Sequence, residues 1–312
     1  MISLATIQSG VAQGLMWAVM TLGIYLTFRI LDVADLTVEG TFPLGAAVTV
    51  VLINRGVNPL LAMLACFAAG LLAGLATGLL HTWFKIPAIL SGILTQIALY
   101  SINIRIMSDK ATVPIMGKSL KKVVAALLPQ GTKSNTMSMI VGVLFCAAII
   151  CILYRFFGTE LGCAIRATGS NNRMARAMGI NTDRMTILCL MLSNGIVAFS
   201  GSLIAQFDYG SALVTMGQGT IVIGLASVII GEVIFLHKEH NFAYKMTAVV
   251  IGAIIYRTII ACALTLPWLK ATDLKLITAI IVAIALALPV FKGRIAFRKV
   301  RKANAKEGNA NA

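Results

Sequence analysis

The side chains of this sequence that could carry chemistry are few, and they do not converge on one site. The Gly-Lys-Ser run at residues 117–119 has the end of a phosphate-binding loop, but Thr112 stands where such a loop needs its first glycine. His237 and His240 have no further His or Cys nearby to complete a metal site. None of the six cysteines forms a C-x-x-C pair. We therefore expect no catalytic residue, no metal site and no cofactor in this chain.

The elements that would hold any site are long apolar runs. Only 12% of the 312 residues are charged and the mean hydropathy is +0.91, whereas a soluble domain carries about 25% charged residues. Continuous apolar runs of about 20 residues are typical of membrane-spanning helices, since the strands of a β-barrel would alternate instead. Nine windows of this kind are Val11–Phe28, Leu36–Ile53, Leu60–Phe84, Ile86–Met107, Met137–Phe157, Met185–Phe207, Val214–Phe235, Met246–Leu264 and Leu276–Phe291. The sequence predicts an all-α, polytopic transmembrane bundle of about nine spans, within a range of eight to ten.

The net charge is strongly basic, +15 from 26 Lys and Arg against 11 Asp and Glu. These basic residues mostly flank the apolar windows and are not interleaved with aromatic residues. They therefore fit membrane topology and anionic lipid rather than nucleic acid. We expect a multi-pass protein of a bacterial inner or plasma membrane. The first basic residue, Arg29, follows the first window, so a cleavable signal peptide is not expected.

The chain divides into residues 1–291, one transmembrane domain, and residues 292–312, a basic cytoplasmic tail. Placing the segment Gly158–Arg184 in the cytoplasm puts most of the Lys and Arg on the inside, as membrane proteins prefer. With nine windows, the N-terminus is then external. The Lys-rich segment Ser108–Thr136 also falls outside, where we expect a surface helix or a re-entrant element.

Polar residues within the windows are candidates for a transport pathway, because polar groups in lipid are costly and should face protein or water. The pathway candidates are Gln96, Asn103, Asn194 and Gln218. Two charged residues have a more structural interpretation: Glu232 pairs with Arg257 in the next window, or it lies at the interface near Lys238. We find no chain of acidic residues of the kind that a proton relay needs.

Gly70, Gly74 and Gly78 are spaced four residues apart in the third window. Residues at this spacing share one face of a helix, and the missing side chains let a second helix approach closely. We expect helix packing at these glycines. Whether the packed helix borders a pathway or is ordinary membrane-helix packing stays open.

The segment Gly158–Arg184 is the one long polar, helix-capable stretch with apolar windows close on both sides. Residues 168–171 (Thr-Gly-Ser-Asn) supply a turn and an N-cap for a short helix, and Gly179 ends that helix. Met174 and Met178 fall on one face of it. Such a helix either docks in a groove of a partner protein or lies on the bilayer surface.

The pattern of this segment is similar to the cytoplasmic coupling region of permeases in the branched-chain amino acid and ribose group of ABC importers. The matching residues are Gly162, Arg166, Ala167, Gly169, Asn171, Ala175, Gly179 and Ile180. Three further stretches resemble one uncharacterised permease branch of that group, namely Tyr25–Gly40, Lys85–Thr95 and Leu99–Met107. The resemblance covers nearly the whole chain.

The resemblance implies a permease subunit whose coupling segment is seated in a cleft of a separate ATPase. It implies a pair of ATPase subunits that hold ATP and Mg, an extracytoplasmic substrate-binding protein, and a second permease copy, as a homodimer or a heterodimer, of which we take the homodimer. Related systems import amino acids, sugars and nucleosides, and no residue here chooses among them. Two other classes stay open: an ion-coupled secondary transporter, and a membrane scaffold or membrane-embedded enzyme.

Overall fold

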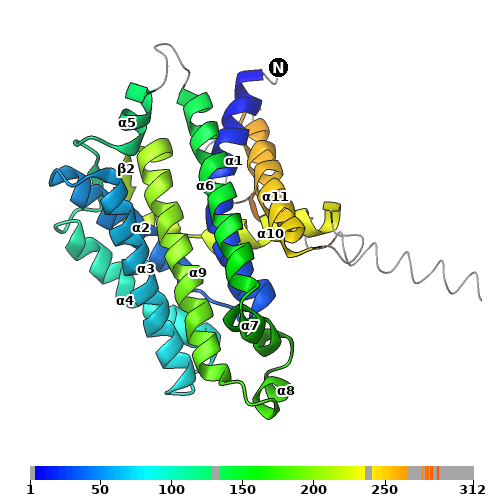
Figure 1. Ribbon diagram of the computed structural model, residues 1–312. Coiled ribbons are helices and arrows are strands. Elements are labelled where there is room, and N and C mark those ends of the chain that lie inside the picture. Colours follow the sequence, from blue (N-terminus) through cyan, green and yellow to red (C-terminus); the bar gives the residue numbers. More distant parts are fainter. Residues whose placement is uncertain are drawn as a thin grey trace, which may run out of the picture.

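The computed structural model describes residues 4–127, 134–235 and 241–265, with a few residues between 276 and 287. It is a bundle of long, tilted helices (Figure 1). Seven described helices are long and apolar enough to cross a membrane, and Val38–Asn54 is a shorter apolar helix of the same bundle. The predicted all-α polytopic bundle is confirmed, and these helices occupy the first eight predicted windows. The window Leu276–Phe291 lies largely outside the described residues, and the tail 292–312 lies wholly outside them.

Long helices account for most of the described chain. They are α1 (Leu4–Tyr25), α2 (Val38–Asn54), α3 (Pro59–Thr82), α4 (Ala88–Ile106), α6 (Ser134–Phe157), α9 (Thr182–Ile204), α10 (Thr220–Phe235) and α11 (Phe242–Ala263). The shorter elements are α5 (Leu120–Leu127), α7 (Glu160–Ser170), α8 (Asn172–Ala177), β1 (Thr112–Pro114) and β2 (Ser211–Leu213). Single π-helical or 3₁₀ turns join some of them, namely η1 (Leu26–Ile30), η2 (Ala205–Tyr209) and η3 (Val214–Gly217).

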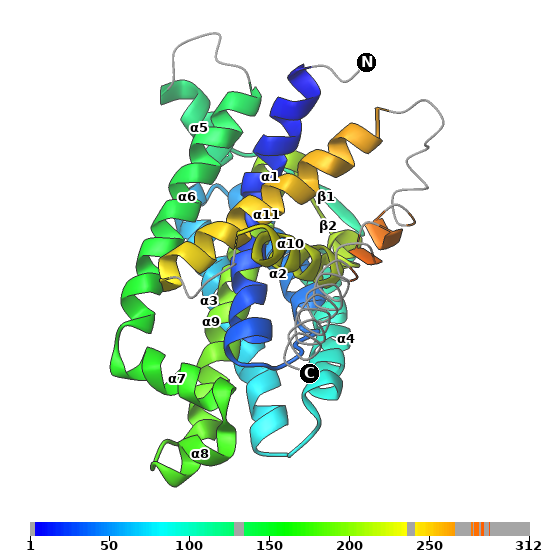
Figure 2. The same cartoon turned by 90° about the vertical axis from the view of Figure 1, so that its right-hand side faces the viewer.

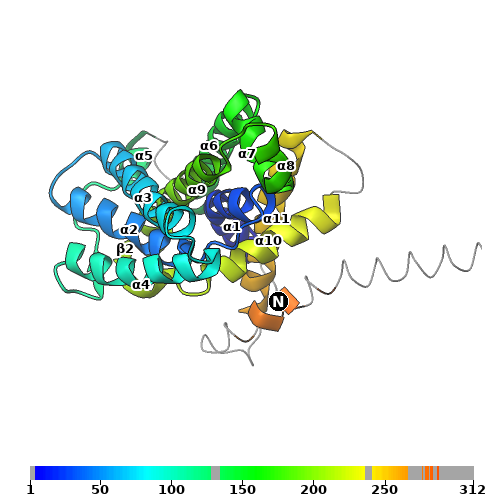
Figure 3. The ribbon, with the colours of Figure 1, turned by 90° about the horizontal axis from the view of Figure 1, so that it is seen from below.

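Two helices occupy the centre of the bundle. In the apolar stretch of each span, 83% of the residues are buried in the span that contains α1 and 72% in the span that contains α9. The corresponding share is 28% in α4 and also in α6. A helix that is apolar all round and buried on most sides belongs in a core, whereas α4 and α6 have faces left for lipid. Viewed from below, α2, α3 and α4 lie on one side of α1 and α9, and α10 and α11 lie on the other (Figure 3).

The glycines of α3 lie against the backbone of α9. A Cβ atom at Gly70 would lie 2.5 Å from the carbonyl oxygen of Asn194, and one at Gly78 would lie 3.1 Å from the Cα of Ile187. Gly74, between them, faces Leu190 at still closer range. Helices approach this closely only where side chains are missing, so the two backbones are in direct contact along this crossing.

The end of the bundle that carries the N-terminus is covered by the segment between α4 and α6. β1 pairs antiparallel with β2, with Val113 opposite Ala212. Asn54, the last residue of α2, donates to the carbonyl oxygen of Pro114 at 2.9 Å. The Gln206 side chain accepts a hydrogen bond from the backbone N–H of Leu120 at 2.8 Å. Of the two alternatives expected for this segment, a surface helix or a re-entrant element, the structure has the surface helix, α5.

Glu232 and Arg257 do not pair. Glu232, near the end of α10, bonds Arg29 at 2.7 Å, because the end of η1 passes beside it. Arg257 lies deeper in α11, where its guanidinium carbon is 3.6 Å from the ring centroid of Trp17. The expected pair is therefore replaced by an ion pair at one end of the bundle and by a cation–π contact inside it. Lys238, the other suggested neighbour of Glu232, lies outside the described residues.

The glycine crossing predicts a sharp difference between two positions of α3. Gly74→Leu should destabilise the protein by about 1–3 kcal/mol or more, because the new side chain has to enter the backbone of α9 at Leu190. Ala76→Leu is the control, since Ala76 is exposed on the same helix. Gel filtration after heating in detergent measures the fraction that stays monodisperse. Equal thermal stability of the two variants would contradict the close crossing.

Candidate functional site

The segment 158–184 forms α7, α8 and the start of α9, at the end of the bundle opposite the N-terminus (Figure 2). Each helix begins at a side-chain cap. Thr159 Oγ1 accepts from the N–H of Gly162 at 3.4 Å, and Asn171 Oδ1 accepts from that of Met174 at 3.0 Å. Asn181 caps α9 in the same way, at 3.1 Å. These bonds satisfy N–H groups that a helix start leaves without partners. The turn expected over 168–171 is confined to Asn171, because α7 continues through Ser170.

The connection from α8 to α9 is fixed by Gly179 and Arg176. Gly179 adopts a φ of +85°, which glycine tolerates, and the N–H of Ile180 then reaches back to the carbonyl oxygen of Ala175 at 3.0 Å. Arg176 donates to Thr182 Oγ1 at 2.6 Å and also to the carboxylate of Asp183 at 2.6 Å. Both acceptors belong to the first turn of α9, so α8 is tied to that helix.

The inner side of α7 is tied to the rest of the bundle. Gly162 packs on the backbone of Phe157, and Gly169 packs on the backbone of Ile30, so closely that neither position has room for a side chain. The Arg166 guanidinium donates to the carbonyl oxygen of Phe157 at 3.0 Å. Of the matching residues named above, Gly162, Gly169 and the buried Ala175 therefore face the rest of the bundle. Ala167 and Ile180 are half-buried.

The outward surface of the segment carries two methionines. Met174 is 63% exposed and Met178 is 73% exposed, and Arg173 beside them is exposed as well. Methionine is flexible and polarisable, and it is over-used at surfaces that bind other proteins. A short helix with an apolar outer face between capped ends is suited to a groove on a partner. The helical spacing in the sequence predicted the shared face of Met174 and Met178. It did not show that Gly162, Gly169 and Ala175 point away from that face, toward the bundle.

A network of polar residues lies where α2 meets α9. Asn194 Nδ2 donates to Asp35 Oδ2 at 2.7 Å, and Asn194 Oδ1 accepts from Thr41 Oγ1 at 2.8 Å. Asp35 Oδ1 also accepts from the backbone N–H of Thr37 at 2.9 Å, and the Thr37 hydroxyl lies 2.7 Å from that of Thr77. All five side chains are buried. Their hydrogen bonds join α2, α3, α9 and the linker 31–37 in the interior of the bundle.

Two other pathway candidates contact the first turn of α2, beside this network. Gln96 of α4 donates to the Glu39 carboxylate at 3.1 Å, and the N–H of Gly219 donates to the same carboxylate at 2.9 Å. Asn103 donates to the carbonyl oxygen of Gly40 at 3.1 Å. The structure thus brings Gln96, Asn103 and Asn194 onto residues 35–41. Gln218 is exposed beside Gly219, in the turn that precedes α10.

Asp35 is the functional candidate that sequence reasoning missed. It lies between two apolar windows and looked like a linker residue, yet only 2% of it is exposed. The signal in the sequence is the spacing of Asp35 and Thr37, which allows an Asx turn, although this spacing does not predict burial. Burial raises the pKa of the Asp35 carboxyl above its ordinary range, and hydrogen bonds from Thr37 and Asn194 oppose that rise. The bundle therefore does contain a buried acid.

Metal ligands do not gather in the part of the chain that the structure describes. No group of three or more His, Cys, Asp or Glu side chains there is placed to hold an ion. His237 and His240 lie outside the described residues. The chemistry offered by the described site is hydrogen bonding and packing.

The network predicts that Asn194 is needed for stability. Asn194→Leu should lower the free energy of unfolding by about 1–3 kcal/mol, because Asp35 loses a buried donor and Thr41 loses an acceptor. The melting temperature in detergent measures the loss. Asn172→Leu serves as the control, since Asn172 is an exposed amide of α8. If both variants melted at the temperature of the wild type, the network would not contribute to stability and the prediction would be wrong.

The sequence matches a known family, described as branched-chain amino acid transport system / permease component, over residues 6–288. A tyrosine transport system permease protein of Clostridioides difficile (strain R20291) is 41% identical over 281 residues, which cover 90% of each chain. An uncharacterized protein of Rickettsia prowazekii (strain Madrid E) is 31% identical over 277 residues, covering 88% of this chain and 94% of its own. An autoinducer 2 import system permease protein of Photorhabdus luminescens is 27% identical over 221 residues, covering 71% of this chain and 62% of its own. No solved structure matches the chain.

The family match extends from α1 to the last described helical residues, so it includes both the capped α7–α8 pair and the polar network on α2. The resemblance inferred from the coupling segment is confirmed. With seven helices long and apolar enough to span a membrane, the protein is a multi-pass protein of the bacterial inner membrane. This chain belongs to the branched-chain amino acid transport system permease family, the permease components of ABC-type import systems for small solutes.

Proposed function

We propose that this chain is the permease subunit of an ATP-driven importer and that α7 and α8 are its contact with a separate ATPase. The observation that carries the proposal is the construction of this helix pair. Three side-chain caps and a left-handed glycine hold it in one conformation, while Met174 and Met178 stay exposed at its outer face. A preorganised apolar face loses little conformational entropy when it docks into a groove.

Movement of the α7–α8 pair would reach the interior by two routes. Gly169 lies against Ile30, directly before the linker that leads to α2. Arg176 holds the first turn of α9, and α9 carries Asn194, which binds Asp35 in the same linker. Both routes end at the start of α2. We infer that closing of the ATPase dimer on ATP and Mg moves this helix pair and switches the exposure of the polar side chains around residues 35–41.

The pathway would run beside Glu39. This carboxylate is half-buried, between Gln96 of α4 and the N–H of Gly219, and Gln218 is exposed next to it. A carboxylate and an amide facing hydrocarbon would be costly. A water-filled pathway between this face and a second copy of the chain removes that cost. We therefore infer a permease homodimer with two ATPase subunits, supplied by an extracytoplasmic binding protein.

The solute class we propose is an amino acid. The support is the name of the Clostridioides difficile relative, a tyrosine transport system permease protein that shares 41% of its aligned residues with this chain. The polar side chains gathered around residues 35–41 include amide, hydroxyl and carboxylate groups, which suit a solute with an ammonium and a carboxylate. Uptake of labelled amino acids into proteoliposomes that hold the permease, its ATPase and its binding protein tests this assignment directly.

The family match disfavours an ion-coupled secondary transporter, and Asp35 is the observation that would speak for one. A buried acid with a raised pKa is a group that a proton-driven carrier could use. The two functions differ in their energy source. Uptake that ends on ATP depletion and persists when the ion gradient is collapsed supports the ATP-driven importer, and the reverse result supports the carrier.

The exposed face of α8, with Met174 and Met178, gives the first functional prediction. The double variant Met174→Glu/Met178→Glu should insert normally but retain less than a tenth of the co-purifying ATPase, because two carboxylates would enter an apolar groove. These positions are better tests than Gly169 or Ala175, where a bulky residue would disturb the permease itself. Quantitative mass spectrometry of the affinity-purified complex measures the ratio of ATPase to permease.

Met116→Glu is the matched control for this experiment. Met116 is 79% exposed, but it lies at the opposite end of the bundle, beside β1. The ATPase ratio should be unchanged in that variant. An unchanged ratio in the double variant would remove α8 from the ATPase contact, and the helix pair would then be an element of the bilayer surface.

The pathway gives the second functional prediction. In a background without the exposed thiols of Cys151 and Cys163, Gln218→Cys should react with a membrane-impermeant thiol reagent, since water reaches the pathway. Leu72→Cys should stay unlabelled, because Leu72 is an exposed apolar residue of α3 that faces lipid. The rate of labelling is measured by the mass shift of the intact protein. Equal labelling at both positions would place the pathway elsewhere.

A further inference from the structure

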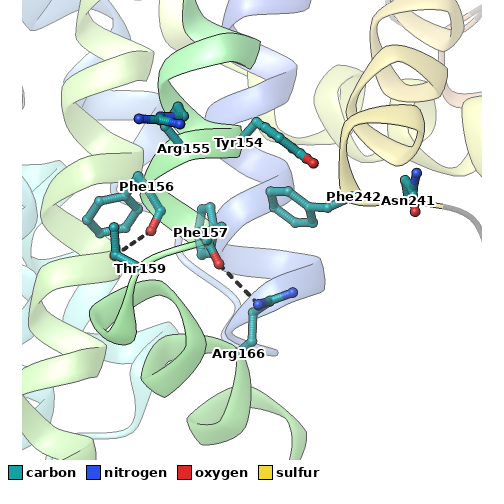
Figure 4. Close-up of a pocket in the computed structure, with 9 residues that line it drawn as sticks. Tyr154, Arg155, Phe156, Phe157, Thr159, Arg166, Asn241 and Phe242 are labelled. Atoms are coloured by element: carbon teal, nitrogen blue, oxygen red, sulfur yellow. Dashed lines mark hydrogen bonds between the residues drawn. The ribbon is translucent and has the colours of Figure 1, made fainter.

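A cavity of about 670 Å³ opens between the end of α6, the start of α7 and the start of α11. Tyr154 from α6 and Phe242 from α11 point toward one another across it, and Arg166 of α7 lies below them (Figure 4). The rings of Phe157 and Phe242, with centroids 5.0 Å apart, close its inner wall. The volume lies within the range of small-molecule sites, about 300–1,000 Å³.

The charge of this cavity is positive. Arg155 and Arg166 both line it, and none of the described residues around it is acidic. Arg166 is held in place by the carbonyl oxygen of Phe157 at 3.0 Å and by the ring of Phe242, 5.8 Å from its guanidinium carbon. The side chain of Arg155 is exposed and forms no hydrogen bond or ion pair with any described residue. Figure 4 shows the Arg155 side chain on the side of α6 away from Tyr154 and Phe242, so Arg166 supplies the guanidinium donors below these rings, and Arg155 adds positive charge at the same end of α6. Guanidinium donors are suited to a phosphate group.

An apolar groove begins at the same place and runs away from α7. It has a volume of about 450 Å³ and shares Tyr154 with the basic cavity. Its walls come from α1, α6 and α11 and include Leu15, Val143, Ala147, Ile150, Tyr154 and Val250. From Tyr154 to Val143 the groove follows α6 for roughly 16 Å, at about 1.5 Å per residue. One leaflet of a bilayer has a hydrocarbon thickness of about 15 Å, half of about 30 Å.

We infer that this cavity and groove together form a binding site for one phospholipid with an anionic headgroup, in the leaflet on the α7–α8 side. The phosphate lies beside Arg166, and Arg155 at the same end of α6 adds to the positive charge that the anionic headgroup meets. One acyl chain follows the groove along α6 and ends near the middle of the bilayer. Tyr154, which borders both parts, lies at the level where the headgroup joins the chains.

A second apolar groove of the bundle serves as a comparison, because no described basic residue lies beside it. It lies between α3, α6 and α9, has a volume of about 490 Å³ and includes Ala148 and Phe199. No basic residue lines it within the described chain, so any acyl chain fits there regardless of its headgroup. The α6–α11 groove differs because two arginines stand at its end. Selectivity for an anionic lipid is therefore expected on one face of α6 only.

Native mass spectrometry of the purified protein, with phosphatidylglycerol or phosphatidylethanolamine added in equal amounts, tests the site. The wild type should retain one phosphatidylglycerol in preference to phosphatidylethanolamine. Arg155→Gln should lower the retained phosphatidylglycerol about fivefold, the factor expected for one basic residue near a lipid headgroup. Ala147→Trp should lower it at least as much by filling the groove, since Ala147 is an exposed residue of its wall.

Two control variants separate this site from general effects. Arg173→Gln removes an exposed arginine outside the cavity, and Ala148→Trp fills the second groove instead of the first. Both should retain phosphatidylglycerol as the wild type does. Loss in all four variants, or equal retention of both lipids by the wild type, would overturn the site. If Arg155→Gln lowers retention and Ala147→Trp does not, the cavity binds phosphate alone, and the lipid assignment is wrong.

Discussion

Asn194 stands where α2, α3 and α9 meet, and the interior of the bundle depends on its contacts. Its backbone carbonyl faces the bare backbone of Gly70, where a Cβ atom would lie only 2.5 Å away. Its side chain holds Asp35 at 2.7 Å and Thr41 at 2.8 Å. Inside a membrane protein there is little water to replace such partners, so each buried group has to find its bond within the chain. One asparagine thus fixes α9 to α3 by packing and to α2 by hydrogen bonds.

The same contacts explain how a surface segment can act on the interior. Packed helix interfaces switch between discrete arrangements rather than deforming gradually. Because Arg176 binds the first turn of α9, and Asn194 lies on the same helix, the proposed displacement of α8 would be transmitted along a rigid element. The packing of Gly169 on Ile30 supplies a parallel connection to the linker before α2. A segment held by flexible side chains would dissipate such a movement.

The sequence predicts those features that depend on neighbouring residues. The apolar windows, the caps and the turn at Gly179 are local features. The structure has all of them except the last window, which lies largely outside the described residues. The glycine spacing of α3 predicts a close partner without naming it, since the partner comes from α9. Asp35 is missed for the same reason, because its burial depends on Asn194, 159 residues away. The inward position of Gly169 likewise depends on its contact with Ile30, which is distant in the sequence and cannot be predicted from helical periodicity.

Several arginines of the bundle have a partner within the chain, whereas the charge of one arginine has to be balanced by another molecule or by solvent ions. Arg29 is neutralised by Glu232 at 2.7 Å, and Arg176 by Asp183 at 2.6 Å. Arg257, which is half-buried, has the ring of Trp17 instead. Arg155 has no such partner in the described chain, although it stands at the end of an apolar helix face. Solvent ions could balance it, but they would not account for the apolar groove that runs from Tyr154 along α6. A molecule that is anionic at one end and apolar over the length of a leaflet accounts for both.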